Sequence, residues 1–386
     1  MTTQKQSTNV LEPSKVSRAD RFTSFVSSDF GRPRGREEEW RFTPMRRIRP
    51  LFDEAGYTGA PEVKAEGSDA VIVATVGREE LEGAVVGAPG DYPAALSWEK
   101  FEETTEVLIP REVEAKDPIY VHIKPGEGLK AGRIVIHAEA LSQATVVLMH
   151  EGPALYNETV EIKADEGAHL SVVSIEEFER HSLYTASHRI TADRDSDVHH
   201  MVVTLGGDTV RVNVDADFGG PGANIRLNGL YFVDAGQHLE HRVFIYHNEP
   251  SCFSRVAYKG ALQGKDARSV WIGDCLIGAK ADATDTYELN RNLILTEGAK
   301  ADSVPNLEIE NGEIEGAGHA SATGRFDDEQ LFYLMSRGVP PLEARRLVVR
   351  GFFAEILSAI GIPELQTRLL GKIEQELKDY NSAFKN

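Results

Sequence analysis

The stretch GAKADATDTYELNRNLIL, residues 278–295, begins a repeat that decides the fold of this chain. Its first five residues recur twenty positions later, at the start of GAKADSVPNLEIENGEIE, residues 298–315. Looser versions open at Gly167, in GAHLSVVSI, and at Gly222, in GANIRLNGLYF. A Gly-Ala turn before an alternating strand, with a period of about 20 residues, is typical of one coil of a β-solenoid. A meander of hairpins with a chance repeat is the alternative.

Strand-like runs surround this repeat and fill residues 118–325. Most of them alternate apolar and polar residues, as strands with one buried face do. Closely spaced strands over this length predict a mainly β fold, which is a sandwich, a barrel or a solenoid, and the repeat favours the solenoid. The clearest runs are IYVHI (119–123), RIVIHAEA (133–140), HLSVVSI (169–175), TVRVNVDAD (209–217), HRVFIYH (241–247) and SVWIGDCLI (269–277).

The N-terminal flank divides into two parts. Residues 1–20 are polar, and we expect a mobile tail. Residues 21–117 read as a mixed, largely helical region, in which a helix over 17–30 is followed by apolar residues at helical spacing around Pro44. The run SDAVIVATV (68–76) predicts a strand within this region.

The C-terminal flank, residues 326–386, predicts a helical domain. Asp327 or Asp328 can cap a first helix that ends at Gly338, and Pro340 and Pro341 suit the start of a second. A solenoid exposes the edge of its last coil, and natural proteins cover such edges. We therefore expect these helices to cap the end of the solenoid.

Composition narrows the class of function. The 386 residues include 42 Lys and Arg against 61 Asp and Glu, a formal charge of −19, which disfavours nucleic acid and anionic membranes as partners. The N-terminus has no apolar signal region, and no apolar run is long enough to cross a bilayer. With only two cysteines, the sequence predicts a soluble, cytoplasmic protein.

Candidate chemical motifs are few and weak. GALQGKD (260–266) resembles a phosphate loop, but its spacing is one residue short and no Ser or Thr follows the Lys. In HLEHRVFIYH (238–247), alternation places His241 and His247 on one face and His238 on the other, so a three-histidine metal site is hard to build there. Cys252 and Cys275 are expected to be buried and inert. His319, among Gly and Ala in EGAGHASATGR, suits a metal ligand only if another subunit completes the site.

Residues 318–357, GHASATGRFDDEQLFYLMSRGVPPLEARRLVVRGFFAEIL, resemble the C-terminal signature of the SufB/SufD family of iron–sulfur cluster assembly scaffolds. EEEWRFTPMRRI (37–48) is similar to the entry segment of its SufD branch, and the low cysteine count also favours that branch. The resemblance implies a right-handed parallel β-helix (a solenoid) flanked by N-terminal and C-terminal helical regions. It also implies a non-catalytic scaffold, with no catalytic residue and no cofactor of its own.

The same resemblance implies partners and sites. The chain would pair with a SufB-like paralogue and dock the ABC-type ATPase SufC through residues 326–386. A homodimer of the chain alone and a chain that pairs only with its paralogue are both left open by the sequence. An iron–sulfur cluster would lie transiently at the SufB interface, with His319 as candidate ligand; Ala317 stands where some relatives have a cysteine. Residues proposed to bind partners are Arg337, Arg346, Arg350, Phe352 and Phe353, with core packing as the alternative for the two Phe. The competing functions are a β-helix enzyme and a histidine-based homo-oligomeric metal-binding protein.

Overall fold

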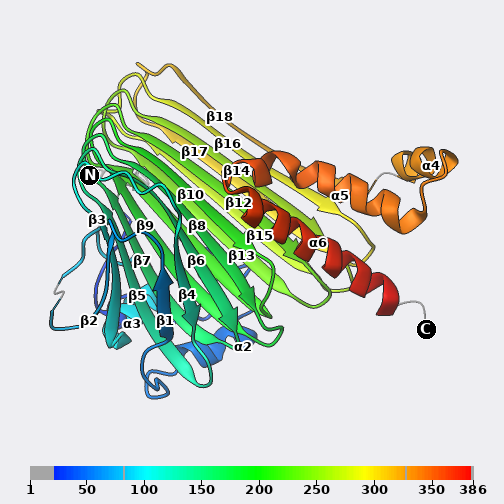
Figure 1. Cartoon of the computed structure of the whole chain (residues 1–386), viewed down its shortest axis with the longest axis horizontal. Helices are drawn as coiled ribbons and strands as arrows, with labels where there is room; N and C mark the ends of the chain where they lie inside the picture. The colour runs from blue at the N-terminus through cyan, green and yellow to red at the C-terminus, as the bar shows by residue number, and fades with distance from the viewer. Residues whose placement is uncertain (1–20, 81–82, 327, 384–386) are drawn as a thin grey trace, which may run out of the picture.

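A computed structural model describes residues 21–80, 83–326 and 328–383, and its centre is a parallel β-solenoid built from two sheets (Figure 1). From β3 onward, successive strands alternate between the sheets. Sheet A has the order β2 (Ile72–Gly77), β3 (Glu103–Ile109), β5 (Leu129–Ala138), β7 (Leu155–Ala164), β9 (Leu183–Ala192), β11 (Thr209–Phe218), β13 (His238–His247), β15 (Arg268–Ile277) and β17 (Lys300–Ile309). Sheet B has the order β1 (Glu62–Glu66), β4 (Ile119–Lys124), β6 (Gln143–Gly152), β8 (His169–Phe178), β10 (Asp197–Thr204), β12 (Asn224–Val233), β14 (Phe253–Leu262), β16 (Asp285–Ile294) and β18 (Gly316–Arg325).

The solenoid prediction is confirmed, but the period expected from the repeat at residues 278 and 298 is too short. Gln143 pairs with His169 on the next coil, and Phe253 pairs with Asp285. A full coil is longer than the repeat because it needs two strands and two turns, one for each sheet. The repeated pentapeptides are not equivalent either: the copy at 278 lies between β15 and β16, whereas the copy at 298 runs into β17.

Apolar side chains fill the interior between the two sheets. Alternate residues of each strand point inward and stack on their register partners in neighbouring coils, as Ala144, Leu170 and Val198 do along sheet B. The middle strands are buried on both faces, since other elements cover the outer faces of the sheets. Continuous burial of this kind is typical of parallel sheets with both faces covered.

The N-terminal region packs on the outer face of sheet A. Its helices are α1 (Ser27–Phe30), η2 (Glu38–Trp40), α2 (Met45–Ile48), η3 (Arg49–Phe52) and α3 (Tyr92–Lys100). Trp40, Phe52 and Tyr92 form a small core against Leu129 and Leu183 of the sheet. The helix expected over 17–30 is a single turn here, and its first residues lie outside the described part, as does the expected tail at 1–20. The predicted strand at 68–76 is β2, and β3 joins the solenoid earlier than residue 118.

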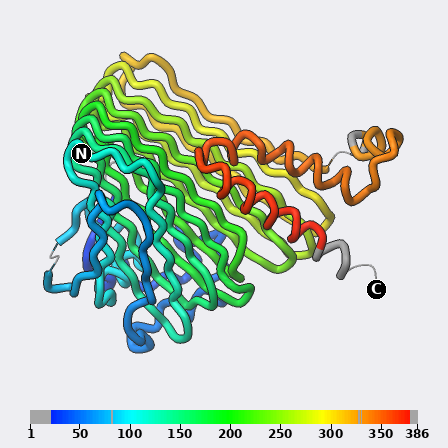
Figure 2. Tube along the Cα trace, viewed as in Figure 1, coloured from blue at the N-terminus to red at the C-terminus, as the bar shows by residue number. Residues whose placement is uncertain are grey.

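The C-terminal helices are α4 (Asp328–Ser336), α5 (Pro341–Ser358) and α6 (Pro363–Ala383). Of these, α5 and α6 pack across the outer face of sheet B and do not cap the end of the solenoid (Figures 1 and 2). Phe353 and Ile373 contact the core formed with Met201 and Phe232 of sheet B. Sheet B offers these helices a broad apolar outer face, which buries more area than a strand edge would. The expectation of a helical end cap is therefore wrong.

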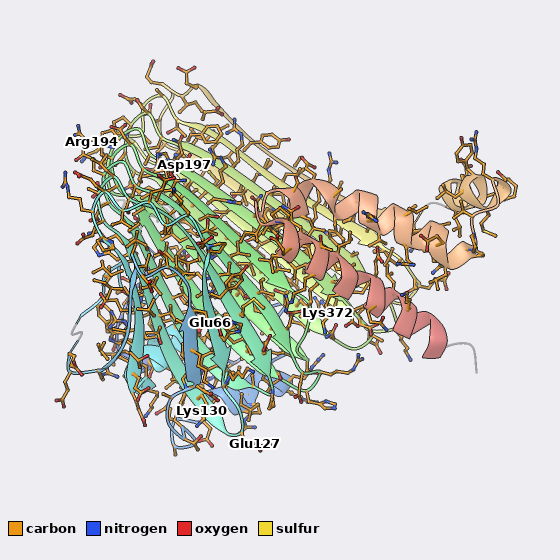
Figure 3. The ribbon with its side chains drawn as sticks, viewed as in Figure 1. Glu66, Glu127, Lys130, Arg194, Asp197 and Lys372 are labelled. Carbon is orange, nitrogen blue, oxygen red and sulfur yellow. The ribbon has the colours of Figure 1, made fainter. Side chains whose placement is uncertain are left out.

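The two ends of the solenoid differ. At the N-terminal end, β1 and β2 add to the sheets in antiparallel register. β1 carries exposed Glu62, Lys64 and Glu66, the last of which is labelled in Figure 3. Charged side chains on a short strand block further pairing at that edge. Within the described residues, no helix is both long and apolar enough to cross a bilayer.

Candidate functional site at the open end of the solenoid

The last coil, β17 and β18, forms what we call the open end. In the part of the chain that the structure describes, each of these strands pairs on one side only, with β15 and β16. Their side chains are half-buried or exposed, whereas inward residues of the preceding coil are buried. β18 has the sequence GAGHASATGR, so small uncharged residues make up most of this long edge. Another chain can therefore approach its backbone closely.

His319 lies in the middle of β18, where its side chain is exposed. Its register partner on β16 is Glu288. Paired residues of neighbouring parallel strands point to the same face of a sheet. Two residues beyond His319, Ser321 bonds to Ser303 of sheet A through their hydroxyls at 2.7 Å, so this face of β18 looks into the interior. His319 thus stands at the mouth of the interior, above Glu288.

Glu288 is the unusual residue beneath this mouth. It is 1% exposed, and neither carboxylate oxygen has a hydrogen-bond partner among the described residues. Burial raises the pKa of Glu288 to about 8. The side chain reaches across the interior, and its Oε2 lies 3.0 Å from the point where a Cβ on Gly273 would be. Trp271 Nε1, on β15, is also buried without a partner in the described chain.

Both cysteines are buried free thiols, which confirms the default expectation. Burial raises the pKa of Cys252 to about 11, and burial together with Glu288 raises that of Cys275 to about 12. Thiols with such pKa values stay protonated at neutral pH and are poor metal ligands. Among the residues that the structure describes, no three His, Cys, Asp or Glu side chains are grouped closely enough to hold a metal ion.

The other candidate histidines form hydrogen bonds or ion pairs within the chain. His241 and His247 share one face of β13, as predicted, and that face points inward: they bond to Thr204 at 2.9 Å and to Ser254 at 2.8 Å. Burial lowers the pKa of each to about 3. His238 points the other way and lies 3.3 Å from Glu240. His200 bonds to His188 at 2.9 Å, also inside the solenoid.

The Gly-rich GALQGKD motif has a packing role. Gly260 lies within β14 and pairs with Tyr231, whose ring occupies the space that a Cβ on Gly260 would need. The glycine is therefore required for close packing of an aromatic side chain. This agrees with the rejection of a phosphate loop from its spacing.

The proposed partner-binding residues divide into two groups. Phe353 is 0% exposed in the core with sheet B, and Arg346 pairs with Glu343 and Glu374 of its own domain, so neither presents a free surface here. Phe352 is half-buried and contributes its carbonyl to Lys259 Nζ. Arg337 and Arg350 are exposed, as the interpretation requires.

Sequence reasoning missed an apolar patch on α4. Phe332 is 72% exposed, and Tyr333 and Met335 are exposed beside it. Arg337 lies over the ring of Tyr333, with its guanidinium carbon 4.7 Å from the ring centroid. α4 extends away from the sheets, beyond the end of α5 (Figure 1). The signal was present as an apolar run, LFYLM (331–335), that one buried face of a helix cannot accommodate.

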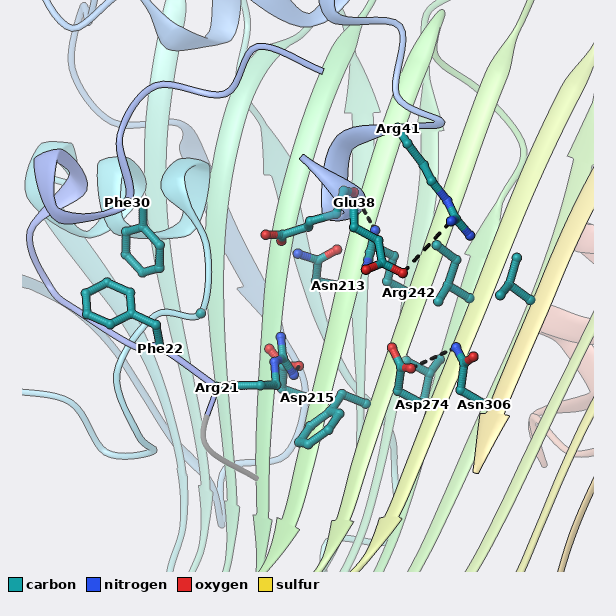
Figure 4. A pocket seen from close by; sticks show the side chains of 16 residues that line it. Arg21, Phe22, Phe30, Glu38, Arg41, Asn213, Asp215, Arg242, Asp274 and Asn306 are labelled. Atoms are coloured by element: carbon teal, nitrogen blue, oxygen red, sulfur yellow. Dashed lines mark hydrogen bonds and ion pairs between the residues drawn. The ribbon is translucent and has the colours of Figure 1, made fainter. Parts of the chain in front are cut away.

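A hollow of about 410 Å³ also lies between the N-terminal segment and the outer face of sheet A (Figure 4). Its charged residues are already paired within the chain. Arg21 bonds to Asp215 at 2.6 Å, and Arg242 donates to the carbonyl of Glu39. This ion pair and this hydrogen bond attach the N-terminal segment to the solenoid and leave little unsatisfied charge for a ligand.

Comparison with known proteins gives a consistent result. Residues 121–352 match the family model described as the SUF system FeS cluster assembly SufBD core domain. An iron–sulfur cluster assembly SufBD family protein of Mycobacterium tuberculosis is 46% identical over 98% of both chains. A SufBD family protein of Mycobacterium leprae is 45% identical over 92% of this chain and 93% of its own. The iron–sulfur cluster assembly protein SufD of Escherichia coli is 25% identical over 90% of each.

Proposed function

Because this chain belongs to the SufBD family of iron–sulfur cluster assembly proteins, we propose that it acts as the SufD-like, non-catalytic scaffold subunit of a SUF complex. In this role it pairs with a SufB-like paralogue and docks a SufC-like ABC-type ATPase. The nascent cluster is then cargo held between the two scaffolds. We expect this assembly to work in the cytoplasm.

The observation that carries the proposal is the open end of the solenoid with His319 at its mouth. In sheet B the N-terminal edge strand β1 is charged, whereas β18 presents an edge made mostly of small uncharged residues beside an exposed imidazole. A second solenoid paired along this edge would bring its own side chains next to His319. Imidazole is a common ligand of iron, and one histidine needs a partner to complete a site.

The ATPase is assigned to α4 and the beginning of α5. The exposed Phe332 and Tyr333 with Arg337 form an apolar patch with a cationic rim, the composition of a protein interface. Since α5 continues from this patch onto sheet B, a pull on α4 would be transmitted to the solenoid wall near β12 and β14. ATP-driven approach of two ATPase subunits would then shift the paired scaffolds relative to each other.

The test is anaerobic purification of the chain from its own cells, followed by mass spectrometry of what accompanies it. We expect a cysteine-bearing paralogue and an ABC-type ATPase in fixed ratio. The variant His319→Ala should retain both partners and lose iron and sulfide from the complex. Recovery of the chain alone at every salt concentration would contradict the scaffold role and favour the enzyme or metal-binding alternatives.

A further inference from the structure

The structure leaves one buried carboxyl group without a partner in the described chain. Buried carboxylates elsewhere in this protein have cationic or hydrogen-bonding partners: Glu161 with Arg133 at 3.1 Å, Glu240 with Arg211 at 3.3 Å, and Glu158 with His150 at 2.9 Å. Glu288 is equally buried and has none in the described chain. Burial of an unpaired polar group is costly, and its usual explanation is a water molecule or an ion that completes the site.

The position of Glu288 favours an ion that enters from the open end. Glu288 lies in the coil directly beneath β18, one strand spacing of about 4.8 Å from His319 in register. The residues flanking His319 on the same face, Ala317 and Ser321, are small, and β18 is the last strand of its sheet in the described chain, so a single strand separates Glu288 from the open end. Glu288 is 1% exposed, so a cation that enters from this end loses its water and displaces side chains of the last coil before it reaches the carboxylate.

We propose that Glu288 and His319 bind one divalent cation together, with Glu288 supplying oxygen and His319 supplying nitrogen. A carboxylate with an imidazole is a donor set that suits ferrous iron, and water or the partner scaffold supplies the remaining positions. This inference rests on the proposed function and deepens it by naming the ion and a second ligand. The inference can be tested separately from the scaffold role, because Glu288 and His319 are expected to bind the cation in the isolated chain, without any partner protein.

The experiment measures cation binding to the purified full chain without oxygen. Fe²⁺ binding is followed by calorimetry, and Co²⁺ serves as a second probe because its absorption bands report nitrogen and oxygen ligands. The variants are Glu288→Gln, His319→Ala and the double variant. Glu315→Gln, which removes an exposed carboxylate just before β18, is the matched control. Circular dichroism and thermal unfolding without metal establish that each variant is folded.

We expect the chain to bind about one equivalent of each ion, and we expect Glu288→Gln to weaken binding at least tenfold. His319→Ala should do the same, the double variant should be little worse than either, and Glu315→Gln should match wild type. Fe²⁺ should raise the melting temperature of wild type and not that of Glu288→Gln.

Two results would overturn the proposal. If Glu288→Gln binds the cations as tightly as wild type does, Glu288 is a neutral structural acid that glutamine can replace. If wild type binds neither Fe²⁺ nor Co²⁺, Glu288 and His319 do not form a cation site. Failure here is distinguishable from failure of the scaffold role. Partners recovered by a chain that binds no cation would contradict only the inference, whereas binding without partners would contradict only the scaffold role.

Discussion

His247 offers a direct test of how the interior is held together. Its ring is fully buried, bonds to Ser254 and packs 4.6 Å from the ring centroid of Phe218. Burial lowers the pKa of His247 to about 3, against an opposing attraction from Asp285. In the unfolded chain a histidine has a pKa of about 6.5. The folded protein therefore needs the neutral ring, while the unfolded chain accepts a proton at a much higher pH.

Proton linkage gives the sign and the size of the pH dependence that His247 adds to the free energy of unfolding. The stability contributed by the neutral ring is complete above about pH 6.5 and is lost as the pH falls toward the folded value. Between pH 7.5 and 5.5 the loss from this one group is about 1.4 kcal/mol, and by pH 4.5 it reaches about 2.7 kcal/mol. Replacing His247 by Gln removes this pH-dependent share. Other titrating groups are common to both proteins and cancel in the difference.

The assay is urea unfolding, followed by tryptophan fluorescence, at pH 7.5, 6.5 and 5.5. We expect the free-energy cost of His247→Gln to shrink by about 1.4 kcal/mol from pH 7.5 to 5.5. His169→Gln, at the exposed start of β8, is the matched control and should follow wild type. A cost of His247→Gln that is the same at all three pH values would refute the reasoning, because it would mean that the ring is protonated or solvated in the folded protein.

Three further predictions concern packing, buried charge and docking. Gly260→Ala forces a methyl group into the ring of Tyr231, and urea unfolding should show a loss of about 1–3 kcal/mol; an unchanged midpoint would contradict the packing role. Arg211→Met leaves Glu240 buried without its main cation, so unfolding should show a loss of about 3–5 kcal/mol, part of which Glu240→Gln added to it should restore. Phe332→Ser should leave the melting temperature within about one degree and weaken ATPase binding in calorimetry by tenfold or more, and equal binding would exclude α4 as the docking site.

The fold class was predictable because strand alternation and glycine turns are local signals. The register of the coils was not predictable, because the two copies of the repeat are not equivalent: the copy at residue 278 forms a turn, and the copy at residue 298 runs into a strand. Only three-dimensional pairing reveals that a coil needs both sheets. The same limit applies to the C-terminal helices, because capping residues and prolines predicted where they begin and end without saying whether they pack on a sheet face or on an edge.

Prediction of the site was limited in a related way. His319 was recognised from residues adjacent to it in sequence, because small neighbours and a family signature are local. Glu288 lies a full coil earlier in the chain and has an ordinary sequence context, so its pairing with His319 follows only from the register of β16 and β18. Phe353 and Arg346 were proposed to bind partners because of their residue types. In the structure Phe353 packs against sheet B and Arg346 pairs with Glu374 of α6, and sequence spacing does not specify these contacts.

The unequal ends of sheet B limit how many neighbours this sheet can accept. A repeat protein with two adhesive ends polymerises, since each added copy restores the surface that it used. In sheet B the charged β1 makes one end inert, and among the described strands of this sheet β18 is left to accept a further strand. Two chains paired through β18 would therefore use up both adhesive edges of this sheet and stop. Sheet B has a valence of one, which favours a pair over a fibre.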